Sequence, residues 1–135
     1  MFRVGDCVTL LDSVEDSSIQ TIYLDPPFNS GRDYKMGLDS DVSFRDTWSG
    51  DQYKDMISKV IDKCIPKLKK DGTMFFHISA EQMAVPEMVL RERFKLVQPI
   101  FWKKCRSKNN VKNRLGATID SVSYTHLTLP TTKQV

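Results

Sequence analysis

Short apolar runs alternate with helical patterns along this chain, and that order leaves few folds open. Residues 19–24 and 73–78 are rich in the β-branched and aromatic residues that strands favour, and residues 96–102 are typical of a third strand. Between the strands, the apolar positions of 49–68 and 80–94 recur at helical spacing. This order predicts an α/β fold built on one layered sheet. The continuous apolar run at 73–78 further favours a buried strand in a parallel sheet.

The first long helix carries its own boundary signals. Ser49 and Gln52 match the capping box, in which a serine and a glutamine three residues later satisfy free amide groups at a helix N-terminus. Pro66 has no amide proton and predicts a kink or an early end. Before this helix, residues 29–49 are polar and rich in turn residues, which predicts a long loop. A loop of that length inside a compact domain is usually functional or mobile.

Length and composition fit one domain of modest charge. The chain has 135 residues, 40% of them hydrophobic and 27% charged, which is ordinary for a globular domain. A net charge of +3 permits a polyanionic partner without requiring one. The three cysteines lie far apart and form no CxxC pair, so we expect reduced thiols and no metal site. No run approaches the ~18 apolar residues of a membrane span, so we expect a cytoplasmic protein without membrane contact.

Basic residues gather after the third predicted strand. Residues 103–114 contain six of them and no acid: Lys103, Lys104, Arg106, Lys108, Lys112 and Arg114. On composition alone, a solvated loop and a phosphate-binding surface are both open interpretations of this stretch.

The DPPF motif, residues 25–28, directly follows the predicted strand at 19–24. One interpretation is that Pro26 and Pro27 merely end the strand, at a place where no ladder donor is needed. However, ligands of open α/β sheets bind beyond the carboxyl ends of the strands, which is where Asp25 lies. A rigid carboxylate beside the Phe28 ring can hold a planar amine, so the motif is a candidate site.

The DPPF motif resembles the catalytic motif of the amino-group DNA methyltransferases. These enzymes move a methyl group from S-adenosylmethionine to the exocyclic nitrogen of adenine or cytosine. The resemblance covers roughly residues 2–122 and is greatest to the modification subunits of type III restriction systems. It implies a Rossmann-like, S-adenosylmethionine-dependent methyltransferase fold. Beyond the motif it extends to Gly5-Asp6-Cys7, Asn29-Ser30-Gly31, Asp46-Thr47-Trp48-Ser49, Lys70-Asp71-Gly72-Thr73 and Ile100-Phe101-Trp102-Lys103-Lys104.

The resemblance implies catalytic roles for the four residues of the DPPF motif. The Asp25 carboxylate and the Pro26 carbonyl would accept the two N–H groups of the target amine, which localises its lone pair for methyl transfer. Pro27 would stiffen this pair of acceptors. Phe28 would stack on a base that has been flipped out of the duplex.

By the same resemblance, Asp6 would contact the adenine of the cofactor, and Cys7 would offer its backbone N–H. No chemical role is expected for the other rings. We expect His77 to be a hydrogen-bonded histidine at the end of its strand, and Trp48 and Trp102 to pack against apolar neighbours.

Adenine is the expected target, because family members that act on cytosine more often carry Ser where Asp25 stands. Cytosine, RNA and a protein amide are alternatives, as is a remnant of the fold that binds nucleic acid without catalysis. The expected partners are DNA and, in addition, a restriction subunit or a second copy of the chain. Beside a DNA-modifying motif, the six basic residues of 103–114 are expected to contact phosphates.

The sequence departs from the family in one respect. Amino-group methyltransferases need a glycine-rich Phe-x-Gly-x-Gly loop near the cofactor, and this chain contains no such string. We therefore expect an incomplete sheet, in a fragment that is inactive alone. Residues 1–122 are assigned to a partial catalytic domain and residues 123–135 to a tail of doubtful origin. The tail shows no usable period and does not resemble the end of a sheet.

Overall fold

The computed structural model describes residues 2–35, 43–104 and 119–126. The helices and strands, in chain order, are α1 (Cys7–Leu11), β1 (Ile19–Leu24), β2 (Arg32–Lys35), β3 (Ser43–Asp46), α2 (Gly50–Cys64), β4 (Leu68–Ser79), α3 (Ala84–Arg91), β5 (Leu96–Lys103) and β6 (Ile119–His126). Two short 3-10 turns, η1 (Ile65–Lys67) and η2 (Ala80–Gln82), precede β4 and α3.

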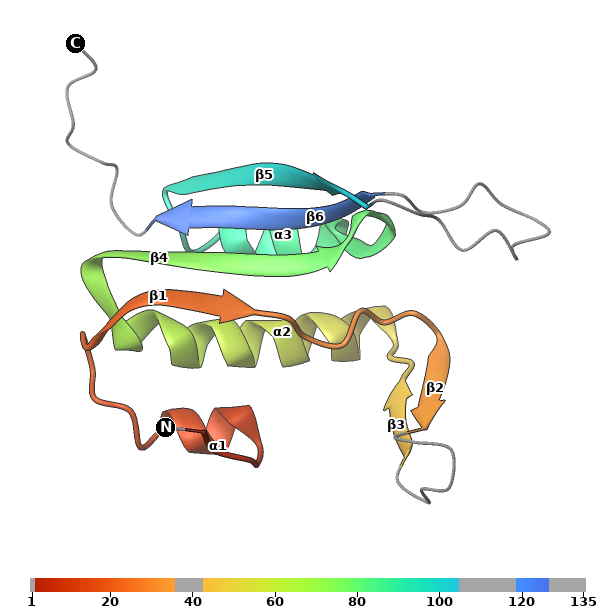
Figure 1. Cartoon of the computed structure of the whole chain (residues 1–135), viewed down its shortest axis with the longest axis horizontal. Coiled ribbons are helices and arrows are strands. Elements are labelled where there is room, and N and C mark those ends of the chain that lie inside the picture. The colour runs from red at the N-terminus through yellow and green to blue at the C-terminus, as the bar shows by residue number, and fades with distance from the viewer. Residues whose placement is uncertain (1, 36–42, 105–118, 127–135) are drawn as a thin grey trace, which may run out of the picture.

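Four strands form the main sheet, in the order β1-β4-β6-β5 (Figure 1). β1 pairs parallel with β4, whereas β6 pairs antiparallel with both β4 and β5. β1, β4 and β5 therefore point in the same direction, with one reversed strand between the last two. The predicted strand, helix, strand, helix, strand order is confirmed, and so is the α/β class.

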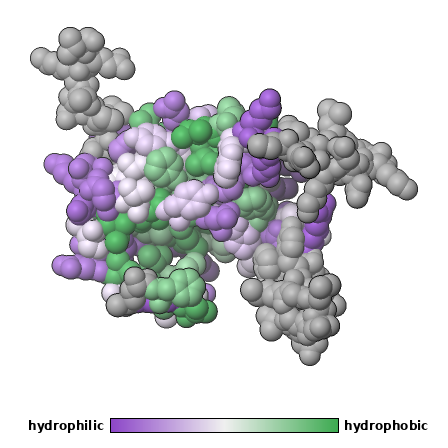
Figure 2. Space-filling model, in the orientation of Figure 1, coloured by the Kyte–Doolittle hydropathy of each residue, from purple (hydrophilic) through white to green (hydrophobic). Residues whose placement is uncertain are grey.

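The core lies between one face of the sheet and the helices α2 and α3. Met74, Phe76 and Ile78 of β4 are at most 1% exposed. They belong to a buried cluster with the helix residues Tyr53, Ile57, Val60, Ile61, Cys64, Val89 and Leu90. Phe75, on the opposite face of β4, is only half-buried, so the expected burial of this strand on both faces is partly wrong. On the face seen in Figure 2, apolar residues lie across the middle and lower part, and hydrophilic ones lie mainly at the left, top and right.

Helix α2 begins and ends where its sequence signals predict. The Ser49 hydroxyl accepts a hydrogen bond from the Gln52 amide, and the Gln52 side chain accepts one from the Ser49 amide, both at 3.3 Å. The helix ends at Cys64, and Pro66 lies in the η1 turn that follows. The capping box and the early end at proline are both confirmed.

Strand β4 begins at Leu68, earlier than the strand predicted at residues 73–78. The register with β1 jumps between the pairs Ile19↔Leu68 and Thr21↔Thr73, so the extra residues form a bulge. Gly72 permits this bulge, since a Cβ at that position would lie 2.9 Å from the Lys69 carbonyl oxygen.

The long loop predicted at residues 29–49 contains a small hairpin. Strands β2 and β3 pair antiparallel, from Arg32↔Asp46 to Lys35↔Ser43. The hairpin stands apart from the main sheet in Figure 1 and leads the chain from the DPPF motif to α2. The loop prediction is therefore wrong for these two short strands, which lack a run of alternating apolar residues.

Strand β6 extends the main sheet beyond residue 122, the predicted end of the catalytic domain. Its pairing continues through Ser123 to His126, on β4 at one side and β5 at the other. The expectation that the sheet does not extend into the tail is therefore wrong. Ser121, Ser123 and Thr125 are buried, so polar residues occupy the core-facing positions and the usual apolar alternation is absent. The origin of the tail stays a prediction, and residues 127–135 lie outside the described part.

Candidate active site

The DPPF motif lies at the carboxyl end of β1, as predicted. The Asp25 side chain is 58% exposed, whereas Pro26, Pro27 and Phe28 are half-buried. Phe28 packs against the hydrophobic core and meets the His77 ring edge-on, with 5.5 Å between ring centroids. The solvent-accessible Asp25 carboxylate thus belongs to a segment that is held rigid by packing against the core.

A buried carboxylate, Asp46, holds the turn that follows the motif. Asp46 is 2% exposed and accepts hydrogen bonds from the Asn29 amide at 2.8 Å and the Ser30 amide at 2.9 Å. The Ser30 hydroxyl donates a third bond at 2.5 Å. Asn29, with a left-handed φ of 54°, accepts a bond from the Trp48 amide at 2.8 Å. Sequence reasoning gave Asp46 no role, and only its place in the Asp46–Ser49 string of the resemblance pointed to it.

Tyr53 connects α2 to the motif. Its hydroxyl donates a hydrogen bond to the Pro27 carbonyl at 3.0 Å, and its side chain is almost completely buried. Burial raises the pKa of Tyr53, and the nearby Asp46 carboxylate raises it further. The hydroxyl therefore stays protonated and remains a donor at any ordinary pH.

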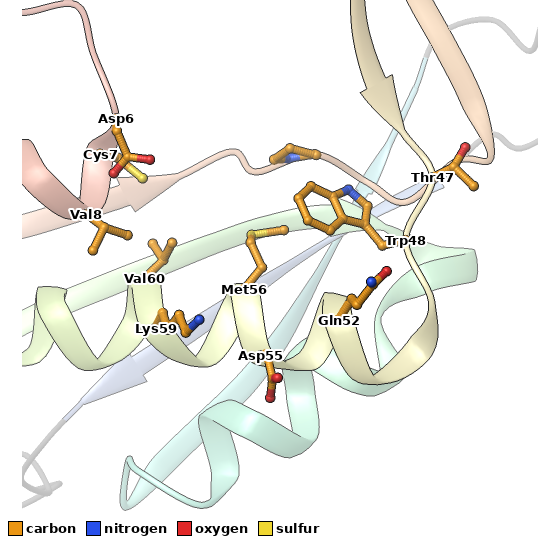
Figure 3. A pocket seen from close by; sticks show the side chains of 11 residues that line it. Asp6, Cys7, Val8, Thr47, Trp48, Gln52, Asp55, Met56, Lys59 and Val60 are labelled. Atoms are coloured by element: carbon orange, nitrogen blue, oxygen red, sulfur yellow. The ribbon is translucent and has the colours of Figure 1, made fainter.

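A cavity of about 740 Å³ opens on one side of the motif. Asp6 and Cys7 line it at one end, and Trp48 and Met56 line it near α2 (Figure 3). Pro27 also contributes to the lining, so the structure brings both predicted cofactor residues to the same cavity as the DPPF motif. The Asp6 carboxylate additionally caps α1, because it accepts a hydrogen bond from the Thr9 amide at 3.1 Å.

A second cavity, of about 330 Å³, is lined by Phe28, whereas the preceding residue, Pro27, lines the first. The rest of its lining comes from the segment after the motif, the end of β4 with the η2 turn, the residue after β5 and the start of β6: Ser30, Arg32, Ser79, Ala80, Glu81, Gln82, Lys104 and Asp120. Consecutive residues of the motif therefore line two different cavities.

His77 lies directly behind the motif, on the neighbouring strand. Its ring is buried, with Nδ1 2.7 Å from the Tyr23 hydroxyl and 3.6 Å from Oδ1 of Asp25. Nε2 lies 3.2 Å from Oδ2 of Asp120. The expected packed and hydrogen-bonded histidine is confirmed, but its contact with Asp25 was not anticipated. The contact results from the register of β1 on β4, because the pairing Leu24↔Phe76 places the next residues, Asp25 and His77, side by side.

The basic residues are described only in part. Lys103 and Lys104 are exposed at and after the end of β5, and the Lys104 ammonium lies 2.6 Å from Oδ2 of Asp120. The predicted DNA contacts at Arg106, Lys108, Lys112 and Arg114 fall outside the described residues. None of the helices in the described part is long and apolar enough to cross a membrane.

Together, the sheet order and the position of the DPPF motif at the carboxyl end of β1 are those of an incomplete Rossmann-like α/β fold. The chain belongs to the DNA methylase family of the N6/N4 type, whose family model matches residues 19–128. The resemblance stated from the sequence is thereby confirmed.

Individual relatives in sequence are also described as methyltransferases. Type II methyltransferase M.BamHI of Bacillus amyloliquefaciens is 40% identical over 73 residues, which cover 54% of this chain and 16% of that protein. DNA adenine methyltransferase YhdJ of Escherichia coli K12 is 26% identical over 118 residues, covering 87% of this chain and 38% of that protein. The chain thus spans well under half the length of these curated relatives.

Solved structures show the same fold. PvuII DNA methyltransferase, described as cytosine-N4-specific, superposes with a TM-score of 0.63 at 20% identity, covering 93% of this chain and 48% of that chain. The modification methylase TTHA0409 of Thermus thermophilus, solved in complex with S-adenosyl-L-methionine, gives a TM-score of 0.61 at 14% identity. That match covers 98% of this chain and 55% of that one.

Proposed function

We propose that this chain is the part of a DNA amino-methyltransferase that carries its catalytic motif, and that the complete enzyme methylates the exocyclic amino group of adenine. One observation carries the proposal: the exposed Asp25 carboxylate belongs to a rigid motif whose residues Pro27 and Phe28 line two different cavities. A reaction between a methyl donor and a target base needs two such spaces near its acceptor groups.

The chemistry of the motif suits an aromatic amine. The lone pair of such an amine is delocalised into its ring, so the amine is a poor nucleophile. The Asp25 carboxylate and the Pro26 carbonyl would accept its two N–H groups and localise the lone pair toward the methyl donor. This is positioning and electrostatic stabilisation, which act without a strong base.

The larger cavity fits the cofactor S-adenosylmethionine. Its lining combines the Asp6 carboxylate with the apolar side chains of Val8, Trp48 and Met56, which suits an adenosyl group with polar edges. The indole N–H of Trp48 is buried and has no hydrogen-bond partner among the described residues. Asp6 and the backbone N–H of Cys7 would hold the adenine. When bound, the cofactor supplies an activated methyl group as a sulfonium.

The smaller cavity is proposed to receive the flipped base. Phe28 in its lining offers an aromatic face for stacking, which contributes about 1–3 kcal/mol per base in nucleic-acid sites. Lys103, Lys104 and the basic residues up to Arg114 would contact the phosphates. A restriction subunit or a second copy of the chain is a further proposed partner.

Adenine is proposed over cytosine because of the acid at position 25. The relatives carry both descriptions, since YhdJ is named an adenine methyltransferase and the PvuII enzyme a cytosine-N4 one. Mass analysis of nucleosides from methylated DNA separates the two, and methylcytosine without methyladenine would overturn this part of the proposal. A binding module without catalysis is the second candidate, and binding of DNA without binding of S-adenosylmethionine would favour it.

The decisive variant is Asp25→Ala in a complete enzyme that contains this segment. Methyl transfer should fall by at least about 100-fold, because an acceptor made for the transition state is lost. Binding of S-adenosylmethionine, measured by calorimetry, should stay within about twofold, since Asp25 does not line the larger cavity.

Glu15→Ala is the matched control, because Glu15 is an exposed acid in the loop before β1. It should leave both methyl transfer and cofactor binding unchanged. Full turnover by Asp25→Ala would refute the catalytic role. DNA binding without any turnover in the unmodified enzyme would favour the binding module instead.

A further inference from the structure

We propose that His77 is a positioning residue for Asp25: the neutral ring leaves the carboxylate free for the substrate amine, and the protonated ring draws the carboxylate away. The inference rests on the proposed function, because it assigns Asp25 the role of amine acceptor. It adds a residue from a different strand to the site and predicts how acid controls the reaction.

The fold places the two side chains together. β1 and β4 are parallel, and the pairing Leu24↔Phe76 brings Asp25 next to His77 at the carboxyl edge of the sheet. Nδ1 of His77 is 3.6 Å from Oδ1 of Asp25. The His77 side chain is 11% exposed and the Asp25 side chain 58%, so a fixed ring faces a carboxylate that is able to move.

The hydrogen bonds define which nitrogen of the neutral ring carries the proton. Nε2 faces the buried Asp120 carboxylate at 3.2 Å, and an ionised carboxylate only accepts hydrogen bonds, so Nε2 is the protonated nitrogen. The Lys104 ammonium, 2.6 Å from the same Asp120 oxygen, balances that charge. The Tyr23 hydroxyl then donates to Nδ1 at 2.7 Å.

The state of Tyr23 agrees with this assignment. Burial raises the pKa of the Tyr23 hydroxyl, and the charges of Asp25 and Asp120 raise it further, so the hydroxyl keeps its proton and acts as the donor. The neutral ring therefore turns the lone pair of Nδ1 toward Tyr23 and Asp25. It offers Asp25 no hydrogen bond, and both carboxylate oxygens stay available for a substrate.

Protonation reverses this arrangement. Among the described residues, the titratable and charged groups around the ring are Tyr23 and Asp25 at and after the end of β1, Asp120 from β6 and Lys104 after β5. The rings of Phe28 and Trp102 pack against it at 5.5 and 5.6 Å. A proton on Nδ1 would create a donor and a positive charge 3.6 Å from Asp25, and the resulting ion pair competes with the substrate amine for the same oxygens.

A spectroscopic test needs no catalytic activity. The chain contains two histidines, so nitrogen-15 NMR of the full chain with labelled histidine resolves both rings. Near neutral pH, His77 should show the tautomer protonated at Nε2. At a fixed acidic pH, Asp25→Asn should lower the fraction of protonated His77 by about twofold or more, because the ring loses one of the two carboxylates beside it.

His126 is the internal control, since its ring contacts Thr73 and Tyr124 and no carboxylate among the described residues. Its protonation should be the same with and without Asp25→Asn. An unchanged protonated fraction at His77, or the opposite tautomer, would overturn the inference whatever the enzymatic result.

The kinetic test uses the pH profile of methyl transfer by the complete enzyme. Activity should fall on the acid side, and His77→Gln, which cannot become a cation, should lose most of that fall while keeping activity within about tenfold at alkaline pH. His77→Leu, which supplies no polar atom toward Tyr23 or Asp120, should be weaker at every pH. If methyl transfer by His77→Gln fell at acidic pH as steeply as that of the unmodified enzyme, the positioning role of His77 would be refuted. Full turnover by Asp25→Ala would refute the proposed function instead.

Discussion

At the scale of single residues, the site depends on side chains that hold the motif as much as on the motif itself. Asp46 accepts three hydrogen bonds from Asn29 and Ser30, and Tyr53 fixes the Pro27 carbonyl. These contacts restrict the backbone on both sides of Phe28. An acceptor that must meet a substrate N–H at hydrogen-bond distance benefits from such restriction, because small displacements weaken the contact.

The Asp46→Asn variant tests this restriction. An amide keeps one acceptor oxygen and turns an NH2 group toward the amide donors of Asn29 and Ser30, so at least one buried bond is lost. We expect the free energy of unfolding to fall by about 1–3 kcal/mol, measured by urea denaturation. Asp71→Asn, at an exposed acid in the β4 bulge, should change it by less than about 0.5 kcal/mol. Equal effects of the two variants would contradict the clamping role of Asp46.

At the scale of elements, α2 joins the core to the site. One face of the helix buries Ile57 and Ile61 against the sheet. Tyr53 at its start reaches the motif, while Met56 and Val60 line the larger cavity. A shift of this helix would therefore move the motif and the cavity lining together, and Gln52 of its capping box also lines the cavity.

The variant Ser49→Ala removes that cap. The Gln52 amide loses its acceptor, and the free energy of unfolding should fall by about 1 kcal/mol. Ser58→Ala is the matched control within the same helix, where alanine is a slightly better helix former and stability should hold or rise a little. If Ser58→Ala lowered the free energy of unfolding as much as Ser49→Ala, the capping box would make no specific contribution to stability.

At the scale of the whole molecule, the described helices α2 and α3 pack on one face of the sheet, and the site occupies its carboxyl edge. Tyr23 and Trp102, on or beside the other face, are each 56% exposed. The buried cluster on the helix side therefore determines stability, and Cys64 lies inside it at 1% exposure. Burial, and to a smaller extent the neighbouring Cys7, raise the pKa of the Cys64 thiol to about 11 from 9.0.

This shift predicts how stability depends on alkaline pH. Because the folded state disfavours the thiolate, the contribution of Cys64 is fully present below about pH 9 and is lost as the pH rises toward 11. Cys64→Ala should lower the free energy of unfolding near neutral pH. Between about pH 9 and pH 11, however, the variant should lose on the order of 1–2 kcal/mol less stability than the unmodified protein does. Urea denaturation across this range measures the difference.

The sequence by itself determined the features whose signals are local. The apolar run of β1, the capping box of α2 and the DPPF motif after a strand each lie within a few residues, so their physical causes can be identified without the fold. The same holds for the family resemblance, which depends on short strings in a fixed order. These features correctly gave the α/β class and placed Asp25 at a strand end.

The tertiary structure alone decided which distant groups meet. Asp46 contacts Ser30 across 16 positions and His77 contacts Tyr23 across 54, and such pairs depend on strand register and helix packing, which no short segment contains. β6 was missed for a related reason: its buried positions carry Ser121, Ser123 and Thr125 rather than apolar residues. Its place in the sheet comes from backbone pairing with β4 and β5, and backbone hydrogen bonds form with any side chain that the neighbours can accommodate.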